Sequence, residues 1–323
     1  EDRGREASPS GGGSRGGGGR SAVSRETRLG IVYAAAAFVL WGLTPAYWKA
    51  LRQVPAAEIL AHRVVWGFVF VAAWMSLRGH WPALRAAVKD ARTVAALAAS
   101  TILIAVNWGV FVWAVNADRV LDTALGYYIN PLVNVVLGLG VLRERLNRLQ
   151  WLAVGLAAAA VAILTVHLGR LPWVSLTLAT SFALYGLLRK TVSADAVVGL
   201  GFETAALAPL AVGFLALQEH RGGAAFGHQG TATDLLLVLS GAVTAVPLIL
   251  FTLGVRRIAL STAGLLQYLS PTLTFLQAVL LFREPFTPAH AASFGLIWIA
   301  LGVYSLDLRR RLRRLAGMMG IGD

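Results

Sequence analysis

The 323-residue sequence has no cysteine and few charged residues. Without cysteine there is no disulfide, no thiolate nucleophile and no thiolate metal ligand. Charged residues make up 14% of the chain, whereas a soluble domain carries about 25%. The sequence also lacks HExxH, GxxxxGK[ST] and GxSxG motifs. We therefore expect no metal, no cofactor and no enzyme activity.

Apolar sequence is what the chain has in abundance. Hydrophobic residues make up 57%, and the mean hydropathy is +0.65. About 20 apolar residues suffice to cross a bilayer as a helix. The sequence therefore predicts an all-α membrane protein with ten transmembrane helices, so the lipid bilayer is its first partner. The predicted segments are 30–51, 57–77, 93–115, 120–142, 149–168, 171–189, 196–218, 233–254, 260–282 and 288–307.

Both ends of the chain differ from this apolar body. Residues 1–28 are dominated by Gly, Ser and Arg, which predicts a disordered tail. Residues 308–323 read as a basic cytoplasmic tail. The connections between the segments are too short to hold a soluble catalytic domain.

The net charge of +13 is distributed unevenly. Most Lys and Arg residues fall in the tails and in alternate loops, on one side of the membrane. Because cytoplasmic loops are enriched in these residues, we predict a multi-pass protein of the inner (plasma) membrane with both termini in the cytoplasm. No basic soluble domain interleaved with aromatics is present, so nucleic-acid binding is not expected.

The second half of the sequence repeats features of the first half. At an offset of 140 residues the matches are Tyr128 with Tyr268, Pro131 with Pro271, Arg143-Glu144 with Arg283-Glu284, and Gly155 with Gly295. Glu58 resembles Glu203 at an offset of 145. Each half has five predicted spans, an odd number, so the second half enters the membrane from the opposite side. We therefore predict two inverted repeats, 29–168 and 169–307, as in secondary transporters.

Polar residues form a stripe in the fourth and ninth segments. Helical spacing places each stripe on one face, and each contains a proline that predicts a kink, Pro131 or Pro271. We predict that these stripes, with polar and aromatic residues of other segments, line a solute site. Helix-to-helix hydrogen bonding and simple packing kinks are the alternatives. The predicted lining is Trp41, Trp66, Asn107, Trp108, Tyr127, Asn130, Asn134, Gln267, Ser270 and Thr274.

Ionisable residues inside the segments are few. An ionised side chain near mid-membrane costs roughly 2.5–3.5 kcal/mol on insertion scales, so it normally faces protein or water. Arg63 fits either a contact to a substrate anion or a structural ion pair. Glu58, His62 and Glu203 are candidates for carrying a coupling proton.

Several longer strings resemble a known family. NWGVFVWAVN, LDTALGYYINPLVNVVLG and LSTAGLLQYLSPTLTFL are similar to the RarD proteins, bacterial inner-membrane permeases of the EamA family in the drug/metabolite transporter superfamily. The wider family usually has Gly before the Glu of its Pro…Arg-Glu pattern, whereas Arg143 and Arg283 occupy that place here. The resemblance implies ten helices in two EamA repeats and export or exchange of small molecules.

These observations favour a secondary transporter that moves a small organic solute by alternating access. Coupling to protons or to a counter-substrate is expected, because no nucleotide-hydrolysing motif is present. An intramembrane enzyme would need a nucleophile or metal set that the sequence lacks. A non-transporting membrane scaffold or receptor is the remaining alternative. The substrate, the direction of transport, the coupling ion and the oligomeric state are left open by the sequence.

Overall fold

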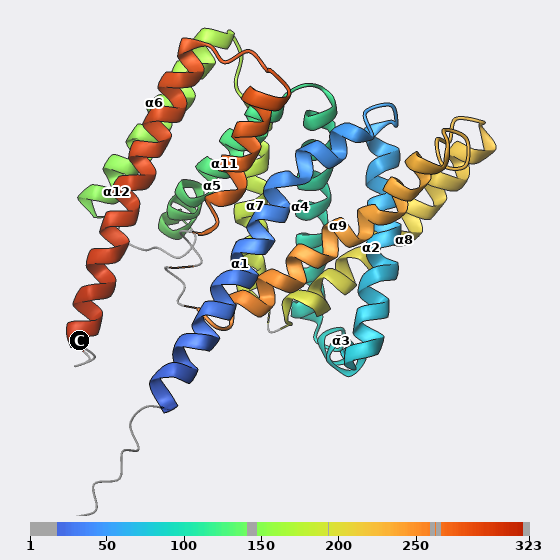
Figure 1. Cartoon of the computed structure of the whole chain (residues 1–323), viewed down its shortest axis with the longest axis horizontal. Coiled ribbons are helices and arrows are strands. Elements are labelled where there is room, and N and C mark those ends of the chain that lie inside the picture. The colour runs from blue at the N-terminus through green and yellow to red at the C-terminus, as the bar shows by residue number, and fades with distance from the viewer. Residues whose placement is uncertain (1–17, 141–146, 193, 259–261, 263–265, 319–323) are drawn as a thin grey trace, which may run out of the picture.

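The computed structural model describes residues 18–140, 147–192, 194–258, 262 and 266–318, and the regular elements in these ranges are helices (Figure 1). The second copy of the Arg-Glu motif, Arg283-Glu284, is described, whereas Arg143-Glu144 lie outside the described residues. The elements are α1 (Gly18–Ala50), α2 (Ala56–Arg78), α3 (Trp81–Ala87), α4 (Ala91–Asn116), α5 (Val120–Gly140), α6 (Arg148–Leu168), α7 (Trp173–Thr191), α8 (Ala196–His220), α9 (Thr231–Val255), α11 (Leu269–Leu276), the π-helical segment η1 (Gln277–Leu281) and α12 (Pro288–Met318).

The predicted segments agree with α2 and α4–α9 to within two residues at each end. The differences lie at the chain ends and near Pro271. Helix α1 begins at Gly18, inside the stretch predicted to be disordered, and α12 continues to Met318, through the predicted basic tail. Pro271 lies in the first turn of α11, where a missing N–H is tolerated, and not in mid-helix as predicted.

Eight of the described helices are long and apolar enough to cross a membrane. They are α1, α2, α4, α5, α6, α8, α9 and α12. Helix α7 carries several hydroxyl residues and ends in Arg189 and Lys190, which lowers its hydropathy. The apolar stretch Leu269–Leu281 is shorter than a full span, and part of the predicted segment before it lies outside the described residues. The protein is therefore an all-α, multi-pass membrane protein.

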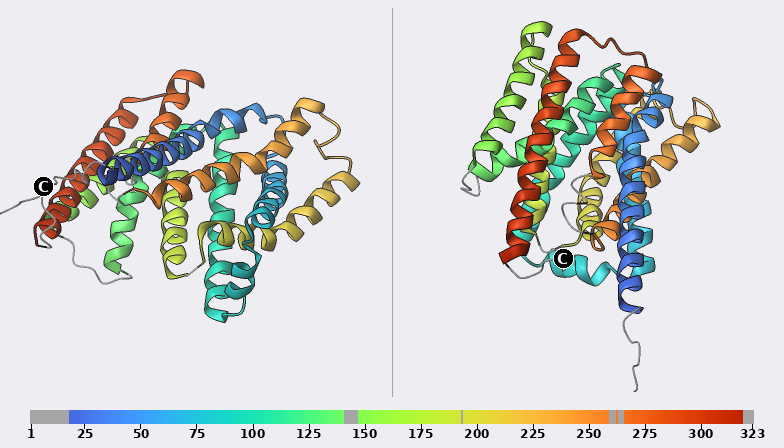
Figure 2. Two further views of the ribbon diagram at one scale, coloured as in Figure 1. Left: turned by 60° about the horizontal axis from the view of Figure 1, so that its bottom comes forward. Right: turned by 60° about the vertical axis from the view of Figure 1, so that its left-hand side comes forward.

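Helices from the two halves of the chain pack against each other. Helix α6 lies beside α12 at one edge of the bundle, and α5 with α7, α1 with α9, and α2 with α8 form further close pairs (Figure 2). The first residues of α2 and α8 are 56 and 196, those of α4 and α9 are 91 and 231, and those of α6 and α12 are 148 and 288. Each pair differs by 140, the offset of the sequence matches. At this offset Glu203 corresponds to Arg63, and not to Glu58 as the sequence comparison had suggested.

The connections gather at two ends of the bundle. We call one the Glu58 end, formed by connections 51–55, 117–119, 221–230 and 282–287; hydrogen bonds join these connections to neighbouring helices. We call the other the Asp195 end, where His80 and Asp195 approach to 3.5 Å. The first turns of α1 and the last turns of α12 both lie towards the Asp195 end (Figure 1). The two ends of the described chain are therefore on the same side.

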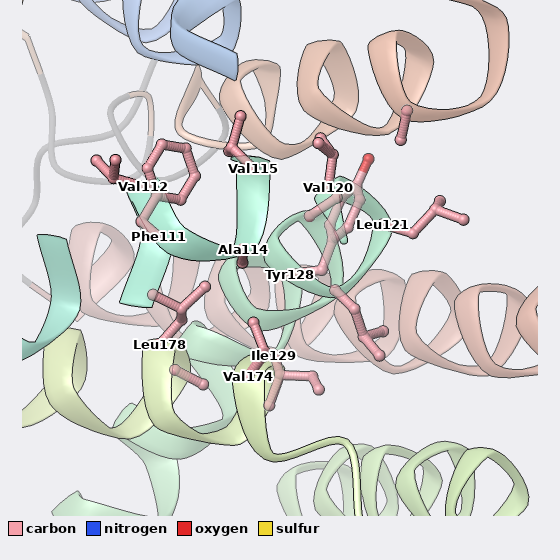
Figure 3. Packing of buried hydrophobic residues seen from close by; sticks show 14 of the residues in the cluster. Phe111, Val112, Ala114, Val115, Val120, Leu121, Tyr128, Ile129, Val174 and Leu178 are labelled. Carbon is pink, nitrogen blue, oxygen red and sulfur yellow. The ribbon is translucent and has the colours of Figure 1, made fainter. Parts of the chain in front are cut away.

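The largest apolar core includes the contact of α4, α5 and α7 and extends to α1, α6 and α12. Side chains such as Phe111 of α4, Ile129 of α5 and Leu178 of α7 interleave there (Figure 3). Gly126 allows this contact, because a Cβ at that position would lie 2.8 Å from the backbone oxygen of Ser175. Small residues at such crossings let helix backbones approach closely in membranes. Helix α5, which carries the first polar stripe, is thus held inside the bundle.

Glu284 joins this core to the last connection. Its two carboxylate oxygens accept the backbone N–H groups of Val120 and Leu121 at 2.7 and 2.8 Å, which caps the start of α5. Burial raises the pKa of the Glu284 carboxyl, while those two hydrogen bonds and Lys49 act in the opposite direction. A residue of the second half thereby fixes a helix of the first half.

Arg283 occupies a backbone conformation that favours glycine. Its φ is +54°, and a left-handed conformation costs an L-residue about 1–2 kcal/mol. Arg283→Gly removes that cost but adds entropy to the unfolded chain, so we expect a stabilisation of up to about 1 kcal/mol. The melting temperature of the purified protein, followed by tryptophan fluorescence, measures it. Arg221→Gly is the control, because Arg221 has φ −86°; a lower melting temperature for Arg283→Gly than for this control would contradict the account.

Candidate functional site

Arg63 lies at the junction of the two halves. Its Nε donates to the Thr244 hydroxyl of α9 at 2.9 Å. Its guanidinium carbon lies 4.3 Å from the ring centre of Trp108 and 5.0 Å from that of Trp48. The side chain is buried, and its Nη1 has no hydrogen-bond partner among the described residues. Arg63 is therefore held by two tryptophan rings and one hydroxyl, and by no ion pair within the described part of the chain.

A second polar cluster, centred on Asn107, joins α4 and α5 to α7. The Asn107 Nδ2 donates to the Leu178 carbonyl at 3.1 Å and to the Ser181 hydroxyl at 3.0 Å. The Tyr127 hydroxyl donates to Asn107 Oδ1 at 3.1 Å. The two bonds from Asn107 to α7 join the two halves of the chain, whereas the bond from Tyr127 lies within the first half.

The polar stripe of α5 continues this contact with α7. Asn130 is buried, and its Nδ2 donates to the Ala179 carbonyl at 3.0 Å. Asn134 is exposed and donates to Asn130 Oδ1 at 3.3 Å. Pro131 lies inside α5, as predicted from the sequence. The stripe predicted on one face of this helix is thus directed to α7 of the second half.

The stripe of α11 makes the corresponding contact with α1. The Thr274 hydroxyl approaches the Gly42 carbonyl at 3.5 Å, and a Cβ at Gly42 would lie 3.0 Å from the Ser270 carbonyl oxygen. Gln267 is half-buried. The sequence predicted that the stripes of the two helices share one site. Instead, the structure packs α5 against α7 and α11 against α1, with the Tyr128 and Thr272 hydroxyls, 2.7 Å apart, linking α5 to α11.

Gln277 is a buried polar residue that the sequence analysis missed. Its Oε1 accepts the Ala46 N–H at 3.0 Å, and its Nε2 donates to the Gly42 carbonyl. These two backbone groups would pair with each other in an uninterrupted helix, so the side chain is inserted into the ladder of α1 next to Pro45. Gln277 follows Thr274 by three residues, so extending the predicted stripe by one turn would have found it.

The predicted aromatic lining is dispersed. Trp41 of α1 packs at 5.6 Å against Phe251 of α9. Trp66 is half-buried in α2, and its Nε1 has no hydrogen-bond partner among the described residues. Trp108 alone of the three contacts Arg63. Trp48, which the sequence did not single out, is the second ring against Arg63, because α1 passes beside α4.

Glu58 and His62 lie at the Glu58 end and not in the centre. Glu58 is completely buried, and its Oε1 accepts the N–H groups of Ala225 at 2.7 Å and Phe226 at 3.3 Å. His62 Nε2 lies 3.9 Å from the same carboxylate, and its ring is 5.0 Å from that of Phe226. These contacts join α2 to the connection between α8 and α9.

Replacing Glu58 is expected to destabilise this connection. Glu58→Ala leaves the buried N–H of Ala225 and the part-buried N–H of Phe226 without this acceptor, and an unsatisfied buried group costs about 1–3 kcal/mol. We expect the melting temperature of the purified protein to fall by several degrees. Glu219→Ala, which removes an exposed carboxylate of α8, should leave it within a degree or so. Equal melting temperatures for the two variants would show that the Glu58 contacts carry little stability.

Glu203, which is completely buried like Glu58, lies towards the Asp195 end. It accepts the Ser100 hydroxyl at 2.7 Å and the Tyr185 hydroxyl at 3.3 Å. No Lys, Arg or His nitrogen among the described residues lies within 4.0 Å of it. Ser100 belongs to α4, so Glu203 joins α8 of the second half to the first half. It does not contact Arg63.

A groove of about 430 Å³ lies between α5, α11 and α12. Tyr128 and Tyr268, which the sequence comparison paired at an offset of 140, both line it, with Thr272 and Trp298 among the other walls. Arg63, Asn107 and Glu203 are absent from its walls. The groove is therefore separate from the polar junction.

Packed apolar helices with buried polar groups at the junction of two half-chains define a multi-pass membrane protein with the arrangement expected of a transporter. The model of the EamA-like transporter family matches residues 28–166 and 173–306. The chain therefore belongs to the EamA-like transporter family, whose members are transporters and not enzymes.

Similar proteins are known from several bacteria. The chain is 44% identical over 286 residues to the uncharacterized transporter YojE of Bacillus subtilis (strain 168), covering 87% of this chain and 95% of the relative. It is 42% identical to protein RarD of Escherichia coli (strain K12), covering 90% and 98%. It is 32% identical to the chloramphenicol-sensitive protein RarD of Pseudomonas aeruginosa, covering 89% and 97%. The resemblance to RarD proteins seen in the sequence is confirmed.

One crystal structure shows the same fold at low sequence identity. It superposes with a TM-score of 0.56 at 20% identity, covering 90% of this chain and 99% of the other. At this identity the likeness concerns the fold alone.

Proposed function

We propose that the protein is a secondary-active transporter that moves a small organic solute, a metabolite or a drug, by alternating access, in export or exchange. The observation that carries the proposal is the bond from Arg63 of the first half to Thr244 of the second. Secondary transporters place their polar site where two repeats meet and rock the repeats about it. Asn107 and Asn130 contact α7 in the same way.

The proposal includes the membrane topology. There are ten transmembrane helices in this proposal. Eight are the candidate spans, the ninth is α7, and the tenth includes the stretch Leu269–Leu281. We infer that the repeats are 29–168 and 169–307, in opposite orientation, and that the Asp195 end faces the cytoplasm, because basic residues are enriched in cytoplasmic loops. The membrane is the cell (plasma) membrane.

The solute site that we propose is the Arg63 junction, where the rings of Trp48 and Trp108 lie against the guanidinium. The stripes of α5 and α11 hold helices of opposite halves together by hydrogen bonds in this conformation. Rearrangement of those bonds would let the halves part. Glu203 is the proposed proton-carrying group, because it is buried, accepts hydrogen bonds from hydroxyl groups of both halves and has no cation within 4.0 Å among the described residues. A counter-substrate is the alternative to the proton.

Counterflow in reconstituted vesicles tests the proposal. Vesicles loaded with a solute are diluted into the labelled solute, over a panel of metabolites and drugs. A transporter accumulates label transiently above the level of protein-free vesicles, whereas a scaffold or receptor does not. Arg63→Ala and Asn130→Ala should reduce the flux of any solute that is found, and Arg52→Ala, which removes an exposed cation, should not. Flux that is unaffected by the first two variants would contradict the site.

A further inference from the structure

We propose that the solute is an organic anion, a small carboxylate with an apolar or aromatic body, and that the Arg63 guanidinium binds its carboxylate. This inference rests on the proposed transport function and names the substrate class for the same junction. The observation behind it is that Arg63 is a buried cation whose Nη1 has no hydrogen-bond partner among the described residues.

The first argument is the missing counter-ion. Arg63 is 8% exposed, yet no carboxylate oxygen among the described residues lies within 4.0 Å of it. Its Nη1 is buried without a partner, while its Nε is taken by Thr244. An uncompensated guanidinium inside a membrane protein is costly, and residues of this kind mark ligand pathways. The structural ion pair that the sequence left open is therefore absent from the described residues.

The second argument is the geometry of the unused donors. A guanidinium presents its N–H groups in a planar fork that matches a carboxylate. Trp48 and Trp108 lie at 5.0 and 4.3 Å from the guanidinium carbon, close enough for cation–π contact. With Nε bonded to Thr244, Nη1 is left for a ligand. Since Nη1 is enclosed here, the ligand reaches it when the two halves part.

The third argument concerns the charge and body of the ligand. Arg63 is the one Lys or Arg of the sequence that lies more than two residues inside a predicted span, since Lys49 and Arg189 lie at the ends of theirs. One cation balances one negative charge, which favours a monocarboxylate over a phosphate ester. The rings of Trp48 and Trp108 provide an aromatic surface for an apolar body. A cationic solute would be repelled at this position.

Matched ligands test the charge requirement on the full chain. Phenylacetate, benzoate and octanoate are compared with phenylacetamide, benzamide and octanamide, and with phenethylamine, by tryptophan-fluorescence melting of the purified protein. We expect at least one carboxylate to raise the melting temperature, while its amide and the amine do not. Arg63→Met should weaken the binding of that carboxylate about 10- to 100-fold, the equivalent of one charged hydrogen bond. Arg63→Lys should retain part of it, because charge remains but the fork is lost.

The controls separate this inference from the transport proposal. Arg52→Met removes an exposed cation and should leave the affinity unchanged. Amides that bind as well as their carboxylates, an absence of any carboxylate effect, or equal binding by Arg63→Met would overturn the anion site. If Arg63→Met does not fold, Arg63→Lys provides the test. An unchanged affinity of Arg63→Lys for the carboxylate would contradict binding by the planar guanidinium. Carboxylate binding without counterflow would contradict the transport proposal but support the anion site. Counterflow restricted to amides or amines would support the transport proposal but contradict the anion site.

Discussion

Glu203→Gln is expected to abolish proton-driven accumulation of the transported solute while preserving its counterflow. Glutamine has nearly the same shape and still accepts a hydrogen bond from Ser100, but it cannot carry a proton. Glu203 is fully buried and contacts only hydroxyl groups by hydrogen bond within the described part of the chain. Such a carboxyl can change its protonation as the halves move and its surroundings alternate between the two solutions.

The measurement uses vesicles with and without an imposed pH gradient. In the wild-type protein the gradient should raise the steady-state accumulation at least several-fold, and in Glu203→Gln the two conditions should coincide. Glu219→Gln, on the same helix but exposed, is the matched control and should behave as wild type. Accumulation by Glu203→Gln that still follows the gradient would remove Glu203 from the coupling mechanism. A wild-type protein that ignores the gradient would favour exchange against a counter-substrate.

Gly241→Ala should give the largest loss of stability among single methyl additions at the α2–α9 contact. A Cβ at Gly241 would lie 2.4 Å from the backbone carbonyl of Trp66 and 2.8 Å from the Gly67 nitrogen. Backbone atoms cannot rotate away, so the helices must separate. Overpacking of this kind costs typically about 1–3 kcal/mol, and occasionally more. Separation of α2 and α9 should also weaken the hydrogen bond between Arg63 and Thr244, because these residues lie on the same two helices.

Gly155→Ala is the control for the added methyl group. Gly155 is also inside a helix, α6, and nothing lies within 4 Å of the Cβ it would gain. Its melting temperature should stay level or rise, since alanine favours a helix over glycine by up to about 1 kcal/mol. Melting of the two purified variants, followed by tryptophan fluorescence, gives the comparison. Similar melting temperatures would mean that α2 and α9 are less tightly packed than the structure shows.

The helices could be predicted from the sequence because the length of an apolar run sets where a membrane helix starts and stops. Helices α2 and α4–α9 end within two residues of the prediction for this reason. The start of α11 could not be placed in the same way. An apolar run continues through Pro271, and only the backbone geometry shows that the proline lies in a first turn.

The site was predictable only in part. The stripes of α5 and α11 were found because helical spacing puts their polar residues on one face. Their partners were not, since a stripe does not tell which neighbour it meets, and α7 and α1 lie far away in sequence. Trp48 was missed because nothing local distinguishes it from an interfacial tryptophan. Gln277 was within reach of the pattern, and Glu284 was noticed as a motif without its role as a cap on α5.

The most direct test of alternating access is a pair of distances measured by pulsed electron spin resonance. The chain has no cysteine, so two introduced cysteines carry the only spin labels. One pair, Gln53→Cys with Gln229→Cys, spans the halves at the Glu58 end, and the other, Arg85→Cys with Ala194→Cys, spans them at the Asp195 end. On addition of a transported solute we predict that one distance increases while the other decreases. Distances that stay fixed, or that change in the same direction, would contradict the account.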